Sequence, residues 1–373
     1  MIIRDEIHGN MEFSSLEEKI IDTPSFQRLR HIKQMSVSNL VYPGANHTRF
    51  EHSLGTAHLS ERIARKIGLD EDEVGKIKLY GLLHDVGHTA FSHEGEDVVK
   101  KYIGNHEELG KKLITSGSIA DIISENYRPK EIAKIGQSKN GIGSIVTSDL
   151  GADRMDYLKR DALNTGVAYG LIDIERVIHT LDFEKNEICI NKRGLEAAEF
   201  LLTARFMMFS AVYMHRTVRI ATAMLYRAID GAIEDGVLEE NELCEIEDEI
   251  ALWKMTTSNK GEPYARRLLN RDLYKEVVSI PKEKINPKDI AKIQMAIKEN
   301  LDCDAIVDYP HTYFKPVSIK VKNEGRLEPI TKISGLITSL RESEEKRAVV
   351  IVAVDKKDKQ KHTKKIKEIL DSA

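Results

Sequence analysis

The stretch Leu82-Leu83-His84-Asp85-Val86-Gly87-His88 places three titratable side chains in an otherwise apolar sequence. Burying such groups costs free energy unless they are paired or bound to a metal ion. Imidazole nitrogens and carboxylate oxygens are suitable ligands for divalent metals. Because adjacent helical residues point about 100° apart, His84 and Asp85 cannot complete a metal site alone. Further ligands must come from other parts of the chain.

Two such residues flank this stretch, namely His52 before it and Asp153 after it. With His84 and Asp85 they would give two imidazoles and two carboxylates, leaving coordination positions open for water or a phosphate oxygen. This ligand set suits iron, manganese, magnesium, nickel or zinc and does not select among them. On the residues alone, an accidental His-Asp pair is an equal alternative to a metal site.

Composition narrows the class of protein. The chain has 373 residues, a formal net charge of −4, 41% hydrophobic and 31% charged residues. This balance gives no bulk attraction to nucleic acid or to a membrane surface. The three cysteines lie far apart without a CxxC motif, which favours a reducing compartment. We find no apolar run near the roughly 18 residues of a membrane span and no signal peptide, so we predict a cytoplasmic protein.

Hydrophobic periodicity predicts a mainly α fold. We expect helices from Pro24 to about Met35 with Asp22 as the N-cap, from Thr48 to Gly68, and over 71–86. A short β-hairpin is expected at 183–192, followed by apolar helices over 195–234 with a possible break. The predicted domains are a multi-helix core over 1–280, with the metal motifs within 45–165, and a smaller α+β region over 281–373. Residues 355–373 are expected to form a frayed, lysine-rich tail.

Longer stretches carry a family resemblance, in order along roughly residues 1–280: Asp5–Gly9 (DEIHG), Ile20–Arg30 (IIDTPSFQRLR), Tyr42–Ala45 (YPGA), Arg49–Gly55 (RFEHSLG), Leu82–His88 and Asp153–Asp161 (DRMDYLKRD). The chain resembles the HD-domain phosphohydrolases, whose pattern is H…HD…D. Within them it is most similar to the deoxynucleoside triphosphate triphosphohydrolases, including the HD region of those that also carry a sterile alpha motif. The resemblance implies an HD-domain core.

The resemblance also implies roles for individual residues. The metal ligands would be His52, His84, Asp85 and Asp153, and the catalytic histidines His88 and His106. Gln34 would contact the sugar edge, although the glycine-rich turn that follows it in the family is Ser36-Val37-Ser38-Asn39 here. The remaining residues of the implied nucleotide pocket are Arg49, Arg154, Tyr157, Asp161, Arg205 and Tyr213.

Three more positions match a regulatory guanine-nucleotide site that the family places between subunits: Asp22, Gln27 and Arg30. The alternative is a helix cap with ordinary surface polar groups. The regulatory interpretation implies a homo-oligomer, a dimer or a tetramer, activated by a guanine nucleotide.

The function implied by the resemblance is metal-dependent hydrolysis of deoxynucleoside triphosphates to deoxynucleoside and inorganic triphosphate. The physical chemistry is consistent: arginine forks match phosphate oxygens, and histidine exchanges protons near neutral pH. Two alternatives stay open, namely a phosphohydrolase of nucleoside monophosphates or cyclic nucleotides, and a nucleotide-sensing or nucleic-acid-binding protein with a structural metal. The 6% aromatic content gives the second little support. We further expect His93 to support the site structurally and Arg28 to be a solvated helix charge.

Overall fold

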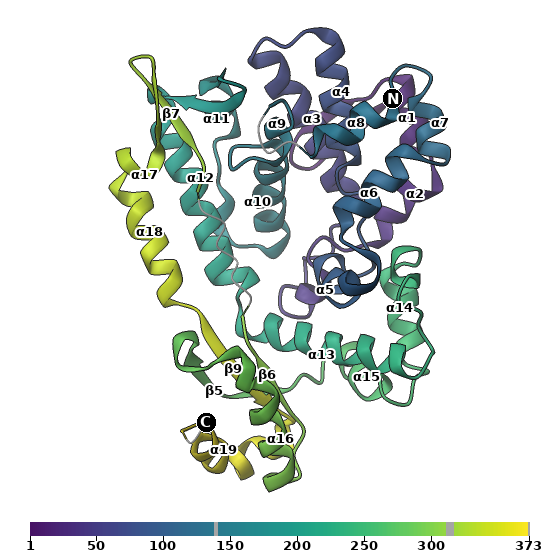
Figure 1. Ribbon diagram of the computed structural model, residues 1–373, viewed down its shortest axis with the longest axis vertical. Coiled ribbons are helices and arrows are strands. Elements are labelled where there is room, and N and C mark those ends of the chain that lie inside the picture. Colours follow the sequence, from purple (N-terminus) through teal and green to yellow (C-terminus); the bar gives the residue numbers. More distant parts are fainter. Residues whose placement is uncertain (138–140, 311–316, 372–373) are drawn as a thin grey trace.

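The computed structural model describes residues 1–137, 141–310 and 317–371, and helices form most of them (Figure 1). This confirms the predicted mainly α fold with a short β-hairpin and an α+β C-terminal part. The N-terminus lies among the helices at one end of the molecule, and the C-terminus lies beside a small sheet at the other.

The chain begins with an antiparallel pair, β1 (Ile2–Asp5) and β2 (Gly9–Glu12). The short helices α1 (Ser15–Ile21) and α2 (Pro24–Gln27) and the 3-10 segments η1 (Arg28–His31) and η2 (Ser36–Leu40) follow. The helix predicted through Met35 is wrong beyond His31, because Ile32 is extended and its carbonyl accepts the N–H of Arg49 at 2.9 Å. The N-cap prediction is also wrong: Thr23 caps α2, whereas Asp22 closes α1.

Three helices carry the motif residues: α3 (Arg49–Lys66), α4 (Glu71–Leu83) and α10 (Ala152–Thr165). Helix α3 begins with a capping box formed by Thr48 and Glu51, and α4 begins with Asp70 as its N-cap. Helix α4 ends three residues earlier than predicted, so His84 is its C-cap and Asp85 starts the following turn. Shorter helices connect α4 to α10: α5 (Ser92–Ile103), α6 (His106–Thr115), α7 (Ser118–Ile123), α8 (Pro129–Ile135) and α9 (Ser144–Thr147).

The predicted hairpin and the broken helix that follows it are both confirmed. After η3 (Ala168–Gly170) and α11 (Ile174–Thr180), strands β3 (Leu181–Glu184) and β4 (Glu187–Asn191) pair in antiparallel fashion. The segment η4 (Lys192–Gly194) leads into α12 (Leu195–Met208), which becomes the π-helical turn η5 (Phe209–Tyr213) before α13 (Arg216–Glu234). Then come η6 (Glu242–Cys244), α14 (Asp248–Met255) and α15 (Glu262–Leu269).

The C-terminal strands belong to two separate sheets. The first, in the order β5-β9-β6, contains β5 (Lys275–Pro281), β6 (Ala305–Asp308) and β9 (Val349–Val354), all antiparallel. In the second, β7 (Lys320–Asn323) and β8 (Arg326–Pro329) extend the hairpin, with Ile190 of β4 in parallel register with Val321 of β7. The remaining elements are η7 (Lys282–Lys284), η8 (Pro287–Asp289), α16 (Ile290–Leu301), α17 (Ile330–Ile333) and α18 (Gly335–Lys346).

The prediction of a frayed tail is wrong for the described residues up to 371. Residues Lys356–Asp371 form helix α19, which buries Ile366 and Leu370 against the C-terminal sheet and α16. Lysines fill the other face, so the sequence looked polar although its apolar residues recur at helical spacing. Residues 372–373 lie outside the described residues, and the domain boundary at 280 stays a prediction.

The long helices α12 and α13 have apolar sequences because their side chains pack into the interior of the protein. Within the described ranges, no single helix has the length and hydropathy of a membrane span. Taken together, α12 (with η4 and η5) and α13 reach those values, but the chain bends by 62° between them. The predicted cytoplasmic location stays a prediction.

Candidate metal centre and nucleotide pocket

The four predicted metal ligands come from the ends of three helices, and the ligand atoms of His52, His84 and Asp153 all lie within 4.8 Å of one another. His52 lies in the second turn of α3, His84 and Asp85 follow α4, and Asp153 lies in the first turn of α10. The Nε2 atom of His52 is 3.2 Å from Oδ1 of Asp153 and 3.6 Å from Oδ2 of Asp85. The Nε2 atom of His84 is 3.2 Å from Oδ1 of Asp85 and 3.9 Å from Oδ1 of Asp153.

These residues fit a divalent cation. Two ligands with bonds of about 2.1 Å to one ion lie roughly 3.0–3.4 Å apart, close to the spacing found here. The Nδ1 atom of His84 lies 2.8 Å from the carbonyl oxygen of Gly81, to which only an N–H can donate. The proton is therefore assigned to Nδ1, and the lone pair of Nε2 faces the carboxylates. Among the described residues, this buried Nε2 has no hydrogen-bond partner.

Charged neighbours keep Asp85 available as an anionic ligand. Burial opposes its ionisation, but His84, Arg49 and His88 hold the pKa of Asp85 well below its ordinary value. The Arg49 guanidinium contacts Oδ2 of Asp85 at 2.5 Å and donates to the Ser92 hydroxyl at 3.0 Å. Arg49 is thus a cation fixed at the edge of the candidate metal centre.

A second group of titratable residues adjoins Asp85: His88, His93, Glu96 and His106. The Nε2 atom of His88 lies 3.4 Å from Oδ1 of Asp85. Nδ1 of His106 donates to Oε2 of Glu96 at 2.5 Å, and Nδ1 of His93 lies 3.6 Å from the same oxygen. The rings of His88 and His106 stack, with centroids 4.2 Å apart and planes at 11°.

This second group is arranged for proton transfer. Burial lowers the pKa of His88 well below its ordinary value, whereas Glu96 raises the pKa of His106 against the effect of burial. A ring shifted toward the neutral form thus lies beside a ring shifted toward the protonated form. The four side chains are close enough to one another to hold a metal ion. However, two imidazoles that bind one ion both point toward it, whereas the rings of His88 and His106 are stacked in parallel.

A strained turn places His93 and Glu96 in this group. Phe91 and Ser92 have φ values of 63° and 57°, in the left-handed region that residues with a side chain rarely adopt. The N–H of Phe91 donates to the buried carboxylate of Asp248 at 2.7 Å, and the Ser92 hydroxyl donates to the carbonyl of Lys33 at 2.7 Å. These contacts hold the turn that starts α5 beside His88.

Three predicted pocket residues, Arg154, Tyr157 and Arg205, interact with one another, and Tyr157 lies near the candidate metal ligand His52. Arg154 pairs with Asp149 and hydrogen-bonds Tyr157, whose ring lies 6.5 Å from that of His52. Arg205 is buried, and its charge acts on both Arg154 and Tyr157. The candidate metal centre therefore faces a cationic wall.

The remaining pocket residues form one connected group with His47. Tyr213, at the end of the π-helical turn η5, donates to Oδ2 of Asp161 at 2.6 Å. Oδ1 of Asp161 is 2.8 Å from Nε2 of His47, and the carbonyl of His47 accepts the backbone N–H of Gln34 at 3.0 Å. The side-chain Oε1 of Gln34 is buried without a hydrogen-bond partner in the described part of the chain, which leaves it for a ligand.

Glu96 and His47 were not predicted from the sequence to belong to the site, and His93 was predicted only to support it structurally. The spacing of His93 and Glu96, one helical turn apart, was the available signal. Arg28 was expected as a solvated charge, which is wrong: it donates to the backbone carbonyls of His88 and Ile246.

The three predicted regulatory residues lie near one another on α1, α2 and η1. Gln27 donates to the carbonyl of Ile21 at 2.8 Å, next to Asp22, and accepts from Nε of Arg30 at 2.8 Å. The Arg30 guanidinium lies 3.5 Å from the centroid of the Phe50 ring. Asp22 and Arg30 are exposed, so they are accessible to a ligand or a second subunit.

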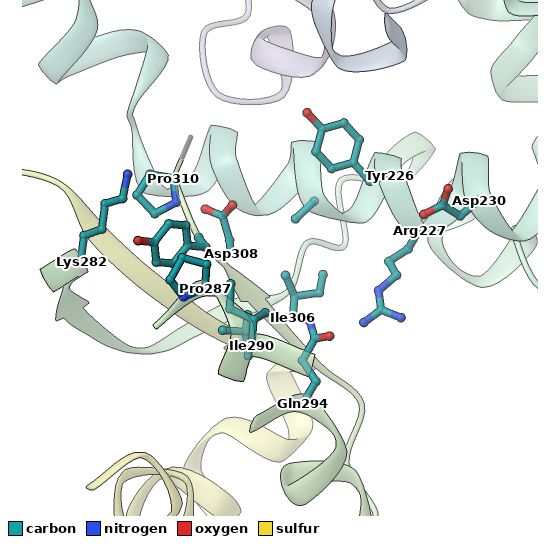
Figure 2. Close-up of a pocket in the computed structure, with 13 residues that line it drawn as sticks. Tyr226, Arg227, Asp230, Lys282, Pro287, Ile290, Gln294, Ile306, Asp308 and Pro310 are labelled. Carbon is teal, nitrogen blue, oxygen red and sulfur yellow. The ribbon is translucent and has the colours of Figure 1, made fainter. Parts of the chain in front are cut away.

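Figure 2 shows a cavity of about 500 Å³ between α13 and the C-terminal sheet. Its lining balances Arg227 and Lys282 against Asp230 and Asp308, and Arg219 pairs with Asp308 at 2.6 Å. None of the predicted site residues line it.

Close packing of α3 against α10 gives a stability prediction. A Cβ atom on Gly55 would overlap the Asp156 carboxylate and lie 2.7 Å from Nη2 of Arg160. Because both side chains are buried and hydrogen-bonded, Gly55→Ala should lower the free energy of unfolding by about 1–3 kcal/mol. Denaturant unfolding measures this change. Gly335→Ala is the control, because a Cβ there meets no atom within 4 Å; equal stability of the two variants would contradict the prediction.

Comparison with known proteins identifies the family of this chain. The HD domain family model matches residues 49–161, and the HD associated region matches residues 172–372. The uncharacterized protein MJ1154 of Methanocaldococcus jannaschii is 38% identical over 360 residues, covering 92% of this chain and 76% of that protein. The deoxynucleoside triphosphate triphosphohydrolase SAMHD1 homolog of Dictyostelium discoideum is 28% identical, covering 80% of this chain and 66% of that protein. A hypothetical protein from Aquifex aeolicus has a similar crystal structure, with a TM-score of 0.83, 28% identity and 99% coverage of both chains.

Proposed function

Because this chain belongs to the HD-domain phosphohydrolase superfamily, which includes dNTPase-like relatives, we propose that it hydrolyses deoxynucleoside triphosphates. The products are the deoxynucleoside and intact inorganic triphosphate. One observation carries the proposal: the candidate metal ligands adjoin both a His–Glu group, through His88 beside Asp85, and a wall of arginines, through Arg49 on Asp85. A triphosphate needs both, since several negative charges must be neutralised while a phosphoester bond breaks.

The two sides of the centre have different tasks in this reaction. Arg49, Arg154 and Arg205 bind phosphate oxygens through their planar forks. Tyr157 stacks on the nucleoside, while Asp161, Tyr213 and Gln34 hydrogen-bond the sugar. When bound, a divalent ion supplies Lewis-acid polarisation of a phosphoryl oxygen and of water.

Proton transfer falls to the His–Glu group. Water adds to the α-phosphorus, the bond from that phosphorus to the 5′-oxygen breaks, and the 5′-oxygen takes one proton. His106, held protonated by Glu96, has a proton to give to the 5′-oxygen, and the neutral ring of His88 can accept one from the attacking water. The orphaned ring nitrogens of His88, which have no hydrogen-bond partner among the described residues, support this role.

A substrate screen tests the proposed function. Purified protein is incubated with each deoxynucleotide, singly and mixed, under Mn²⁺, Mg²⁺, Fe²⁺, Ni²⁺ or Zn²⁺. Deoxynucleoside release from the triphosphates, and none from monophosphates or cyclic nucleotides, is the expected result. Release from monophosphates alone would contradict the proposal.

We also propose that Asp22, Gln27 and Arg30 bind an activating guanine nucleotide between subunits of a dimer or tetramer. The exposed Arg30 guanidinium, already stacked on an aromatic ring, supports this assignment. Arg30→Ala should remove a stimulation by GTP or dGTP of about 5–150-fold while leaving the unstimulated rate unchanged. Rates with and without nucleotide, together with mass by light scattering, measure it. Arg65→Ala is the control, since Arg65 is an exposed arginine paired with Glu61 and Glu71. Stimulation that survives in Arg30→Ala would refute the assignment.

A further inference from the structure

Behind the candidate metal centre lies a buried network that the proposed reaction does not use. Its centre is Asp156, which is fully buried on α10 one turn after Asp153. Oδ2 of Asp156 is 2.7 Å from Nδ1 of His52, and Oδ1 is 2.7 Å from Nε2 of His8. One carboxylate thus connects a candidate metal ligand with a histidine near the N-terminus.

Arg160 connects this carboxylate to the N-terminal turn. It lies one turn after Asp156 on α10, is fully buried, and donates to Asp156 through Nε at 3.0 Å and Nη2 at 2.9 Å. Nη1 donates to Oδ2 of Asp5 at 2.9 Å. Oδ1 of Asp5 also accepts the backbone N–H groups of Ile7 and His8, at 2.9 Å each. The turn between β1 and β2 is therefore built onto α10.

Placing these charges in the interior costs free energy that an apolar cluster would avoid. The arrangement fixes the orientation of the His52 side chain. Because a carboxylate only accepts hydrogen bonds, Nδ1 of His52 carries a proton that it donates to Asp156, and Nε2 is then the ring nitrogen that faces Asp85 and Asp153. Gly55, one turn after His52 on α3, leaves the space that Asp156 occupies.

We propose that Asp156 and His8 are positioning residues: they fix the ring orientation and the tautomer of His52 and thereby set the affinity of the metal centre. The N-terminal turn Asp5–His8 is then part of the metal site, although its side chains do not reach the ligand atoms. The inference rests on the proposed metal site.

Metal affinity without any nucleotide tests this proposal on the full chain. Metal-stripped protein is titrated with Mn²⁺, and free Mn²⁺ is followed by electron paramagnetic resonance. Asp156→Asn should weaken Mn²⁺ binding by about 10–100-fold, the usual effect of removing a hydrogen-bond partner of a metal-bound histidine. His8→Gln removes a partner of Asp156 and should weaken Mn²⁺ binding by a smaller factor, above about twofold. His8→Gln is the milder change, so it keeps the test decisive if Asp156→Asn does not fold.

His58 provides the matched control. Its ring lies 5.5 Å from that of His8, and burial together with the neighbouring His8 lowers its pKa to about 4, so it is a neutral neighbour. Asp156 makes its side-chain hydrogen bonds with His52, His8 and Arg160. His58→Gln should therefore leave the Mn²⁺ affinity within about twofold of the parent.

A spectroscopic readout separates positioning from a general loss of stability. Nitrogen-15 NMR of labelled histidines should show a proton on Nδ1 of His52 in the parent and in His58→Gln, and a tautomer mixture in Asp156→Asn, because an amide can donate to Nδ1 as well as accept from it. Unchanged Mn²⁺ affinity and tautomer in folded Asp156→Asn would overturn the positioning role of Asp156, and unchanged Mn²⁺ affinity in folded His8→Gln would overturn that of His8. A parent protein that binds no divalent cation would instead reject the metal site on which the proposed function depends.

Discussion

Replacing Asp85 by alanine is expected to remove bound metal and to reduce turnover by at least about 10³-fold. Asp85 lies within 3.6 Å of Nε2 of both His52 and His84, and it also faces His88 and Arg49. Its loss removes one ligand and leaves the Arg49 charge without its partner. A metal ion contributes several kcal/mol of transition-state stabilisation, and each 1.4 kcal/mol is about a tenfold change in rate.

Elemental analysis after dialysis and the rate of deoxynucleoside release measure the two effects. His84→Ala should behave in the same way. Far-ultraviolet circular dichroism should stay near that of the parent, because His84 and Asp85 lie in the turn that follows α4 and not in the apolar interior of a helix. Full metal content or full activity in either variant would reject the proposed ligand set.

His106→Ala should reduce turnover by about 10²–10⁴-fold. Unlike Asp85→Ala, it should keep its bound metal. Nδ1 of His106 hydrogen-bonds Glu96, and the ring of His106 stacks on that of His88. His106 is not among the proposed metal ligands, so its removal should not release the metal. The variant removes the proton donor and also leaves Glu96 without its main partner.

Glu96→Gln provides a graded companion to this variant, because it keeps the side-chain volume but removes the charge that raises the pKa of His106. The pKa of His106 should then fall, since the remaining influence of burial lowers it. Turnover should decrease at neutral pH and recover partly at lower pH, where His106 is protonated again. Loss of metal from His106→Ala would instead move His106 into the ligand set.

The metal ligands could be predicted because they lie in short local motifs. His84 and Asp85 are adjacent, and His52 and Asp153 occur within runs that are distinctive on their own. The structure places the ligand atoms of His52, His84 and Asp153 within 4.8 Å of one another and Asp85 beside both histidines, and their role as metal ligands stays a prediction. Gln34, Asp161 and Tyr213 were also named from sequence, but His47, which connects them through its carbonyl and its ring, was not, because only the tertiary fold brings it to Asp161.

The features missed from the sequence depend on contacts between distant segments. Strand β5 pairs with β9 about 70 residues later, and β7 joins β4 across more than a hundred residues, so neither partner could be identified from local patterns. Helix α19 was mistaken for a solvated tail because lysines dominate its composition. The helix expected through Met35 ends early because Ile32 pairs with the start of α3, a contact that overrides local propensity.

The central claim is that the four ligands, the His–Glu group and the arginine wall act together on the α-phosphorus of a deoxynucleoside triphosphate. Hydrolysis in H₂¹⁸O with mass analysis of both products tests it most directly. We predict one ¹⁸O atom in intact inorganic triphosphate, none in the released deoxynucleoside, and no product from Asp85→Ala. Label in orthophosphate or pyrophosphate, or label in the deoxynucleoside, would contradict the account.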